Sequence, residues 1–168
     1  MSLIKKILFV SNQAAINDQT ALQQALLAAR AFNAELSCLV INPLTGKHGQ
    51  AIHDNLQQCL ASSAEALALP APAVSITLLD DKHPALATIR HLLQHRHDLV
   101  IKAADMDEQR HGFQSMDMKL LRKCPAPLWL CRPGKTQALK IAVAIDPQYE
   151  DKAGEQLSID LLQLALQL

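Results

Sequence analysis

The sequence alternates between short apolar runs and longer segments whose apolar residues recur with helical spacing. The apolar runs cover residues 4–11, 34–41, 74–79, 98–102 and 128–131, and the helical segments cover 17–33, 53–69, 84–95 and 115–123. Strands that alternate with helices of this length are joined by right-handed crossovers and build a parallel sheet covered on both faces. The pattern therefore predicts an α/β fold with a five-stranded, doubly wound parallel sheet that is complete by Pro133.

Each helical segment has an apolar face that we expect to pack against the sheet. The first helix places Leu22, Leu26 and Phe32 on one face. In the helix over residues 84–95, the residues expected to point inward are Leu86, Ile89, Leu92 and Leu93.

The chain continues beyond this five-stranded unit. Residues 134–137 are interpreted as a linker, followed by a strand at 139–145 and a helix with leucines on one face. The opening KKILFVSN recurs there as LKIAVAID, and each run precedes a polar gap and a Leu/Gln-rich helix. The recurrence predicts that 138–168 begins a second copy of the domain formed by 1–133. The alternative is that residues 138–168 add a sixth strand and a helix to the first sheet.

Composition excludes several classes of partner. Sixteen basic residues balance sixteen acidic ones, and aromatic residues make up 3% of the chain. Nucleic-acid binding requires a concentrated positive surface and often aromatic stacking, and the sequence has neither. No apolar run approaches the roughly 18–20 residues that cross a bilayer, and the run at 7–10 is too short for a signal peptide. We expect a cytoplasmic protein that binds neither nucleic acid nor membrane.

The cysteine pattern predicts packing roles rather than metal binding or redox chemistry. Cys38, Cys59, Cys124 and Cys131 form no C-x-x-C pair and match no zinc spacing, so we expect buried or half-buried thiols. Two basic residues precede Cys124 and would lower its thiol pKa, but its place before a strand favours a packing role.

Three histidines have a spacing that can hold a metal. His91 and His95 are four residues apart on a predicted helix, and His97 follows closely. A basic helix C-terminus is also favoured by the helix dipole, and we prefer that interpretation to a metal site. The sequence also lacks a nucleophile elbow, so we predict no catalytic residues and no metal.

Several motifs resemble the universal stress protein family. They are CLVINP at 38–43, the helix start at His83 and Pro84, DLVIK at 98–102, and LLRKCPAPLWL at 120–130. The resemblance implies a Rossmann-like fold of the adenine nucleotide alpha hydrolase type, with strand order 3-2-1-4-5. The second start near Leu139 implies the tandem, two-domain E-type members of that family.

Nucleotide-binding members of this family carry G-x-x-G and, further on, G-S or G-T after the fourth strand. Glycines there let backbone N–H groups approach the phosphates at a helix start. In this chain the three glycine positions hold Ala103, Met106 and Gln114, and only Ser115 is kept. Forcing a non-glycine residue into a left-handed conformation costs about 1–2 kcal/mol. The resemblance therefore implies a degenerate nucleotide site.

Other positions match the pattern of nucleotide-binding members only in part. Asn12 stands where nucleotide-binding members have an aspartate, and Val40 matches a residue that contacts the base but is interpreted as a core residue. Asp105 and Asp107 would lie near the phosphates and repel them, with Lys102 among the few residues of opposite charge.

We therefore predict a non-enzymatic regulatory domain without a cofactor, acting through dimerisation or partner binding. The alternative is an ATP- or AMP-binding protein, a sensor or weak ATPase, that uses Asn12, Val40, Lys102 and Ser115. A third possibility is another ligand, of apolar character, in the cleft at the carboxyl ends of the strands.

The fifth strand predicts a pairing surface. Pro125 and Pro127 precede it, and proline is tolerated on edge strands because an edge can spare N–H donors. An apolar edge invites pairing with another edge, so we expect a homodimer or a domain–domain contact through this strand. The residues of this predicted dimer edge are Leu128, Trp129, Leu130 and Cys131.

Overall fold

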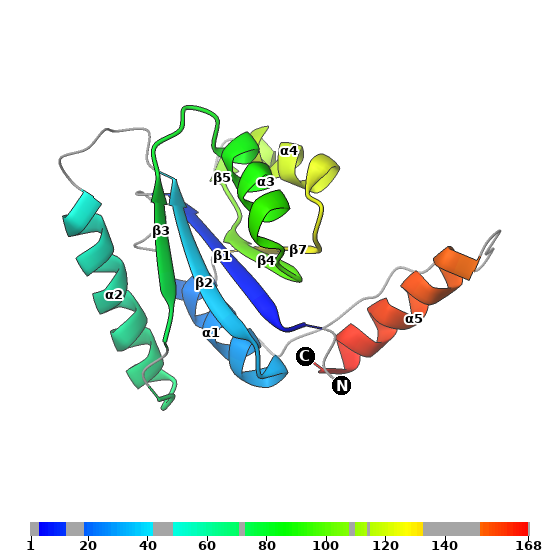
Figure 1. Ribbon diagram of the computed structural model, residues 1–168, viewed down its shortest axis with the longest axis horizontal. Helices are drawn as coiled ribbons and strands as arrows, with labels where there is room; N and C mark the ends of the chain where they lie inside the picture. Colours follow the sequence, from blue (N-terminus) through cyan, green and yellow to red (C-terminus); the bar gives the residue numbers. More distant parts are fainter. Residues whose placement is uncertain are drawn as a thin grey trace.

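A computed structural model describes residues 4–12, 19–41, 49–70, 73–107, 110–113, 115–132 and 152–167 of the chain (Figure 1). The main strands are β1 (Lys6–Asn12), β2 (Glu35–Ile41), β3 (Ser75–Leu79), β4 (Leu99–Ala103) and β7 (Leu128–Cys131). The helices are α1 (Gln19–Phe32), α2 (Gly49–Ala66), α3 (Pro84–His95), α4 (Ser115–Lys123) and α5 (Lys152–Gln167). A small hairpin is formed by β5 (Met106–Asp107) and β6 (Arg110–Phe113). No described helix is long and apolar enough to cross a membrane.

The five main strands form one parallel sheet in the order β3-β2-β1-β4-β7. This is the predicted doubly wound sheet, because the chain adds strands on one side of β1, through β2 to β3, and then crosses to the other side of β1 with β4 and β7. At the centre, Val10 of β1 lies between Leu39 of β2 and Lys102 of β4. All five residues of β4 are buried, as is typical of a parallel strand covered on both faces.

Helices cover both faces of the sheet, with α1 and α2 on one side and α3 and α4 on the other (Figure 1). Alternate residues of β1 divide between the two cores, since side chains along a strand point to opposite faces. Ile7 and Phe9 pack in the core with α1 and α2. Leu8 and Val10 pack in the smaller core that includes α3 residues. The predicted inward face of α1 is confirmed, because Leu22, Leu26 and Phe32 are buried.

The predicted inward face of α3 is only partly right, because Leu92 is buried and Ile89 half-buried but the other two leucines are exposed. Leu86 and Leu93 are 42% and 67% exposed, whereas the buried residues are Ala85, Ala87, Thr88, His91 and Leu92. Positions 85, 88 and 92 have the same helical spacing as 86, 89 and 93, so periodicity alone fits either face. Small side chains allow the helix to approach the sheet closely, and the buried Thr88 hydroxyl donates to the Pro84 carbonyl oxygen at 2.9 Å.

Asp98 joins the amino-terminal ends of the two central strands. Its Oδ2 atom accepts hydrogen bonds from the backbone N–H groups of Lys5 and Lys6, each at 2.9 Å. The Asp98 N–H donates to the Lys6 carbonyl oxygen at 2.8 Å. These three bonds fix where β1 and β4 begin relative to each other.

Helix α5 lies near the amino-terminal end of β1 (Figure 1). Leu164 packs against the larger core, and α5 with Ile4 and residues 125–127 encloses a cavity of about 380 Å³. Leu157 lines this cavity and is 59% exposed. The helix thus forms where the sequence predicted it, whereas the preceding predicted strand at 139–145 lies outside the described residues.

Candidate functional site

The segment after β4 forms a hairpin in place of the glycine-rich loop of nucleotide-binding proteins. Met106 pairs with Phe113 and Asp107 with Arg110 across the β5–β6 hairpin. The described non-glycine residues with positive φ are Asn33, Ala68 and Arg96, so Ala103 to Asp107 contains none. The expected left-handed strain is therefore absent at Ala103 and Met106, the two glycine positions that the structure describes, because both lie in strands that residues with a Cβ adopt readily.

Lys102 lies at the centre of a buried ion-pair network, defined here as Lys102, Asp105 and Asp117. The lysine side chain is 3% exposed, and its Nζ atom lies 2.8 Å from Oδ2 of Asp105 and 3.1 Å from Oδ1 of Asp117. Nζ also donates to the Ala103 carbonyl oxygen at 2.7 Å. The Asp117 side chain is fully buried, and Asp105 is 22% exposed. The ammonium group thus has three internal oxygen neighbours and little contact with solvent.

Two backbone donors of the segment after β4 are also occupied. The Ala104 N–H donates to the Cys131 carbonyl oxygen at 2.7 Å. The Asp105 N–H donates to Oδ2 of Asp117 at 2.8 Å. Phosphate binding at the start of a helix depends on free N–H groups that point toward the anion, and these two point into the protein instead.

The electrostatics of the network oppose an added anion. Two carboxylates neighbour one ammonium group, so the network carries a formal charge of −1 when all three groups are ionised. Asp117 Oδ1 contacts the ammonium but has no well-aligned hydrogen bond within the described residues. The lysine is therefore paired with these carboxylates inside the chain.

The other predicted nucleotide-site residues lie on several elements. Val40 is fully buried in the core with α1 and α2, which confirms its interpretation as a core residue. Asn12 ends β1 opposite Ile41, and Ala103 ends β4 opposite Cys131. Met106 starts β5 and Ser115 starts α4, whereas Gln114 lies outside the described residues.

Comparisons with known proteins agree on one family. No family model matches the chain. Universal stress protein E of Salmonella typhi is 28% identical over 102 residues, which are 56% of this chain and 32% of that relative. The chain thus spans about a third of the length of this curated relative. The sequence similarity thus points to the universal stress proteins.

Solved structures of universal stress proteins share the fold. The protein from Archaeoglobus fulgidus has a TM-score of 0.55 at 12% identity, covering 75% of this chain and 92% of that one. The universal stress protein from Archaeoglobus fulgidus in complex with dAMP has a TM-score of 0.51 at 13% identity, covering 77% and 98%. At these identities the similarity concerns the fold alone.

The sequence pattern did not single out Asp117. The indication available was Lys102 itself, a lysine at the end of an otherwise apolar strand. A buried ammonium group requires a counter-charge, and Asp117 in the first turn of the next helix is a nearby carboxylate.

Strand β7 is an edge of the sheet, as the universal stress protein strand order predicts. One side pairs with β4, where Trp129 lies opposite Ile101 and Leu130 opposite Lys102. Leu128, Trp129 and Leu130 are partly buried, and Cys131 is buried. The predicted dimer edge therefore has one side of its backbone paired within the chain.

The three histidines cluster at the end of α3. The ring centroid of His91 lies 4.5 Å from that of His95 and 5.7 Å from that of His97. Burial lowers the pKa of His97 to about 4, with further lowering by His91, His95 and Lys6 and an opposing effect of Asp98. Within the described residues, no group of His, Cys, Asp or Glu side chains could hold a metal ion.

The cysteine thiols have packing environments. All four are free, with Cys38 and Cys131 buried and Cys59 and Cys124 half-buried, as predicted. Burial raises the pKa of the Cys124 thiol, against the lowering expected from its basic neighbours. Burial raises the pKa of Cys38 to about 12. The packing role that we preferred for Cys124 fits this environment, because a raised pKa disfavours the reactive thiolate.

Proposed function

We propose that this universal stress protein domain is a non-enzymatic regulatory domain whose family nucleotide site does not bind nucleotide. The ion-pair network of Lys102, Asp105 and Asp117 carries the proposal, because it pairs the buried Lys102 ammonium group with two internal carboxylates. On this proposal the domain has no cofactor and acts through its surface, in the cytoplasm.

The energetic argument follows from the burial of the network. To bind a phosphate, Lys102 would have to leave the fully buried Asp117. Breaking a buried ion pair costs on the order of 3–5 kcal/mol. That cost corresponds to about two to three and a half decades of affinity. A nucleotide would also meet the hairpin in place of free backbone donors.

A thermal-shift titration with ATP, ADP and AMP at millimolar concentration tests the proposal. A ligand at 100 times its Kd stabilises a protein by about 2.7 kcal/mol, or about 5–10 °C for a domain of this size. We expect no concentration-dependent shift for any of the three nucleotides. A shift of that size that saturates at micromolar concentration would contradict the proposal, and phosphate release from ATP would contradict its non-enzymatic part.

The alternative is a nucleotide-binding universal stress protein that uses Asn12, Val40, Lys102 and Ser115. The observation in its favour is the shared fold with the Archaeoglobus fulgidus protein in complex with dAMP. On this alternative the same titration gives a shift, and Ser115→Ala removes it because Ser115 begins α4. A shift that Ser115→Ala leaves unchanged would place the nucleotide elsewhere.

The proposal includes self-association through β7. Its support is the edge position of Leu128 to Cys131 and the partly buried apolar side chains there. Light scattering should give a species larger than a monomer, and Leu130→Lys should convert it to a monomer. The matched control is Leu166→Lys, at a position 88% exposed on α5, which should leave the assembly intact. A monomer at every concentration of the parent chain would refute this part.

We also propose that residues 138–168 begin a second domain, as in tandem E-type members. The recurrence of the strand pattern and the formation of α5 at the predicted place support it. Cleavage within 134–137 should then leave 1–133 folded, as judged by circular dichroism. Unfolding of the 1–133 product would indicate that the C-terminal unit belongs to the first sheet.

A further inference from the structure

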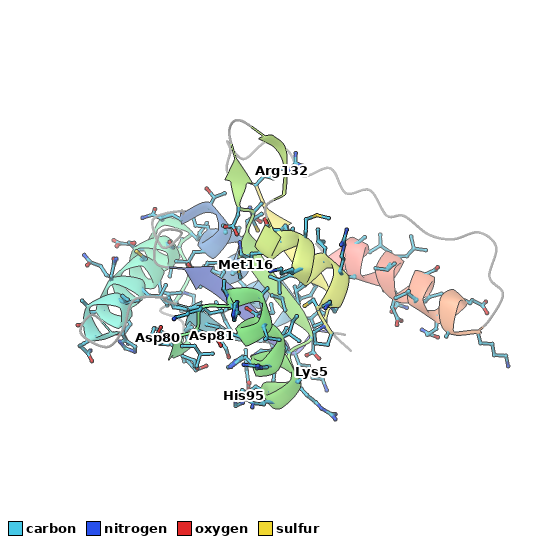
Figure 2. The ribbon with its side chains drawn as sticks, turned by 90° about the horizontal axis from the view of Figure 1, so that it is seen from above. Lys5, Asp80, Asp81, His95, Met116 and Arg132 are labelled. Atoms are coloured by element: carbon cyan, nitrogen blue, oxygen red, sulfur yellow. The ribbon has the colours of Figure 1, made fainter. Side chains whose placement is uncertain are left out.

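A groove lies between the first half of α3 and helix α4, apart from the network of Lys102, Asp105 and Asp117. Its volume is about 540 Å³, and it is lined by residues 82–86 and Ile89 together with Met116, Lys119 and Lys123. Met116, labelled in Figure 2, lies where these two helices meet. Sites for small organic ligands typically have about 300–1,000 Å³, so the groove has the size of a ligand site.

The floor of this groove is apolar. It includes Leu86, Ile89 and Met116, and Leu86 is 42% exposed. The orientation of α3 accounts for this surface, because Ala85 and Thr88 rather than Leu86 face the sheet. Met116 packs partly against the smaller core, which fixes one wall of the groove. The apolar surface therefore faces solvent, and covering it with an apolar ligand would be favourable.

The rim of the groove is basic. Lys82, Lys119 and Lys123 line it and are exposed, and the two lysines of α4 are four residues apart on one side of the helix. No carboxylate is among its described lining residues. The neighbouring Asp81 has its own partners, since it lies 3.8 Å from Arg90 and accepts from the His83 N–H at 2.7 Å. The groove thus combines positive charge with an apolar floor.

We propose that this α3–α4 groove binds a small amphiphile with an anionic head and an apolar body. The lysines of the rim take the carboxylate, sulfonate or phosphate head, and Leu86, Ile89 and Met116 take the apolar body. A cationic or purely polar ligand lacks one of the two complementary features. The proposal is independent of the nucleotide question, because no residue of the Lys102 network lines the groove.

The test uses the full 168-residue chain and dodecanoate below its micellar concentration, measured by isothermal titration calorimetry. The variant Lys119→Glu with Lys123→Glu reverses two rim charges and should weaken binding about tenfold or more. The matched control is Arg122→Glu with Lys152→Glu, which makes the same change in net charge at exposed positions outside the groove lining. The control should bind like the parent chain, and circular dichroism should show that both variants are folded.

Two further ligands separate the contributions of head and body. Acetate shares the carboxylate and 1-dodecanol shares the apolar chain, so each should bind more weakly than dodecanoate. The proposal is overturned if dodecanoate does not bind the parent chain, or if the two double variants bind it equally. It is also overturned if acetate binds as tightly as dodecanoate, because the apolar floor would then contribute nothing.

Discussion

Substitution of Asp117 by alanine tests the energetics of the buried network most directly. The change leaves the Lys102 ammonium, which is 3% exposed, with Asp105 as its remaining carboxylate. It also removes the acceptor of the Asp105 N–H. Leaving one partner of a buried ion pair uncompensated costs about 3–5 kcal/mol. For a domain of this size the melting temperature should fall by about 6–20 °C.

Urea unfolding at pH 7 measures this loss, followed by circular dichroism and by the fluorescence of Trp129, the single tryptophan. Asp54→Ala is the control, because that side chain is 61% exposed and its loss should cost no more than about 0.5 kcal/mol. The double variant Lys102→Met with Asp117→Leu should recover most of the stability, since an apolar pair can replace a buried ion pair.

Two results would refute this reasoning. One is a loss below about 1 kcal/mol for Asp117→Ala, which would mean that the ammonium reaches solvent or another partner. The other is a double variant no more stable than the single one. Asp105→Ala provides a graded comparison, because Asp105 is 22% exposed and should contribute less than Asp117.

Three further predictions concern other parts of the chain. The pKa of His97 in the folded chain is about 4, below its usual 6.5, so its contribution to the free energy of unfolding should be fully present above pH 6.5 and should be lost as the pH falls toward 4. His97→Gln should therefore flatten the dependence of the urea midpoint on pH in this range. Cys38, with a pKa of about 12, should resist alkylation at pH 8 in the folded chain, whereas half-buried Cys59 should react first, as mass spectrometry of peptides would show. Leu56→Ala should cost about 2–5 kcal/mol in urea unfolding because Leu56 is fully buried, and Leu166→Ala should cost almost nothing.

Sequence patterns predicted the sheet well because its central strands, β1, β2 and β4, are largely buried on both faces. Such strands are continuous apolar runs, and the helices between them force parallel crossovers. The five strands and their order follow from these two properties together with the family resemblance. The same reasoning held only in part for α3, where Leu92 is buried but Leu86 and Leu93 are exposed and small residues pack against the sheet in their place.

The candidate site was predicted only in part. The loss of the three glycines indicated a degenerate site, but it did not indicate what replaces the loop. The hairpin at 106–113 contains mostly polar and charged residues and no alternating apolar pattern, so nothing local predicted strands there. The Lys102–Asp117 pair depends on a tertiary contact between β4 and the first turn of α4, which periodicity cannot reveal.

The bonds from Asp98 to the start of β1 have a consequence for folding kinetics. The carboxylate joins backbone groups 92 and 93 positions away, so these bonds form only after a long loop has closed. Contacts of such high sequence separation slow the folding of parallel sheets. If these hydrogen bonds to Asp98 form after the transition state, Asp98→Ala should raise the unfolding rate and leave the folding rate nearly unchanged. Stopped-flow measurements of both rates would show whether β1 and β4 pair before or after the folding transition state. A slower folding rate for Asp98→Ala would mean that this pairing is part of the folding nucleus.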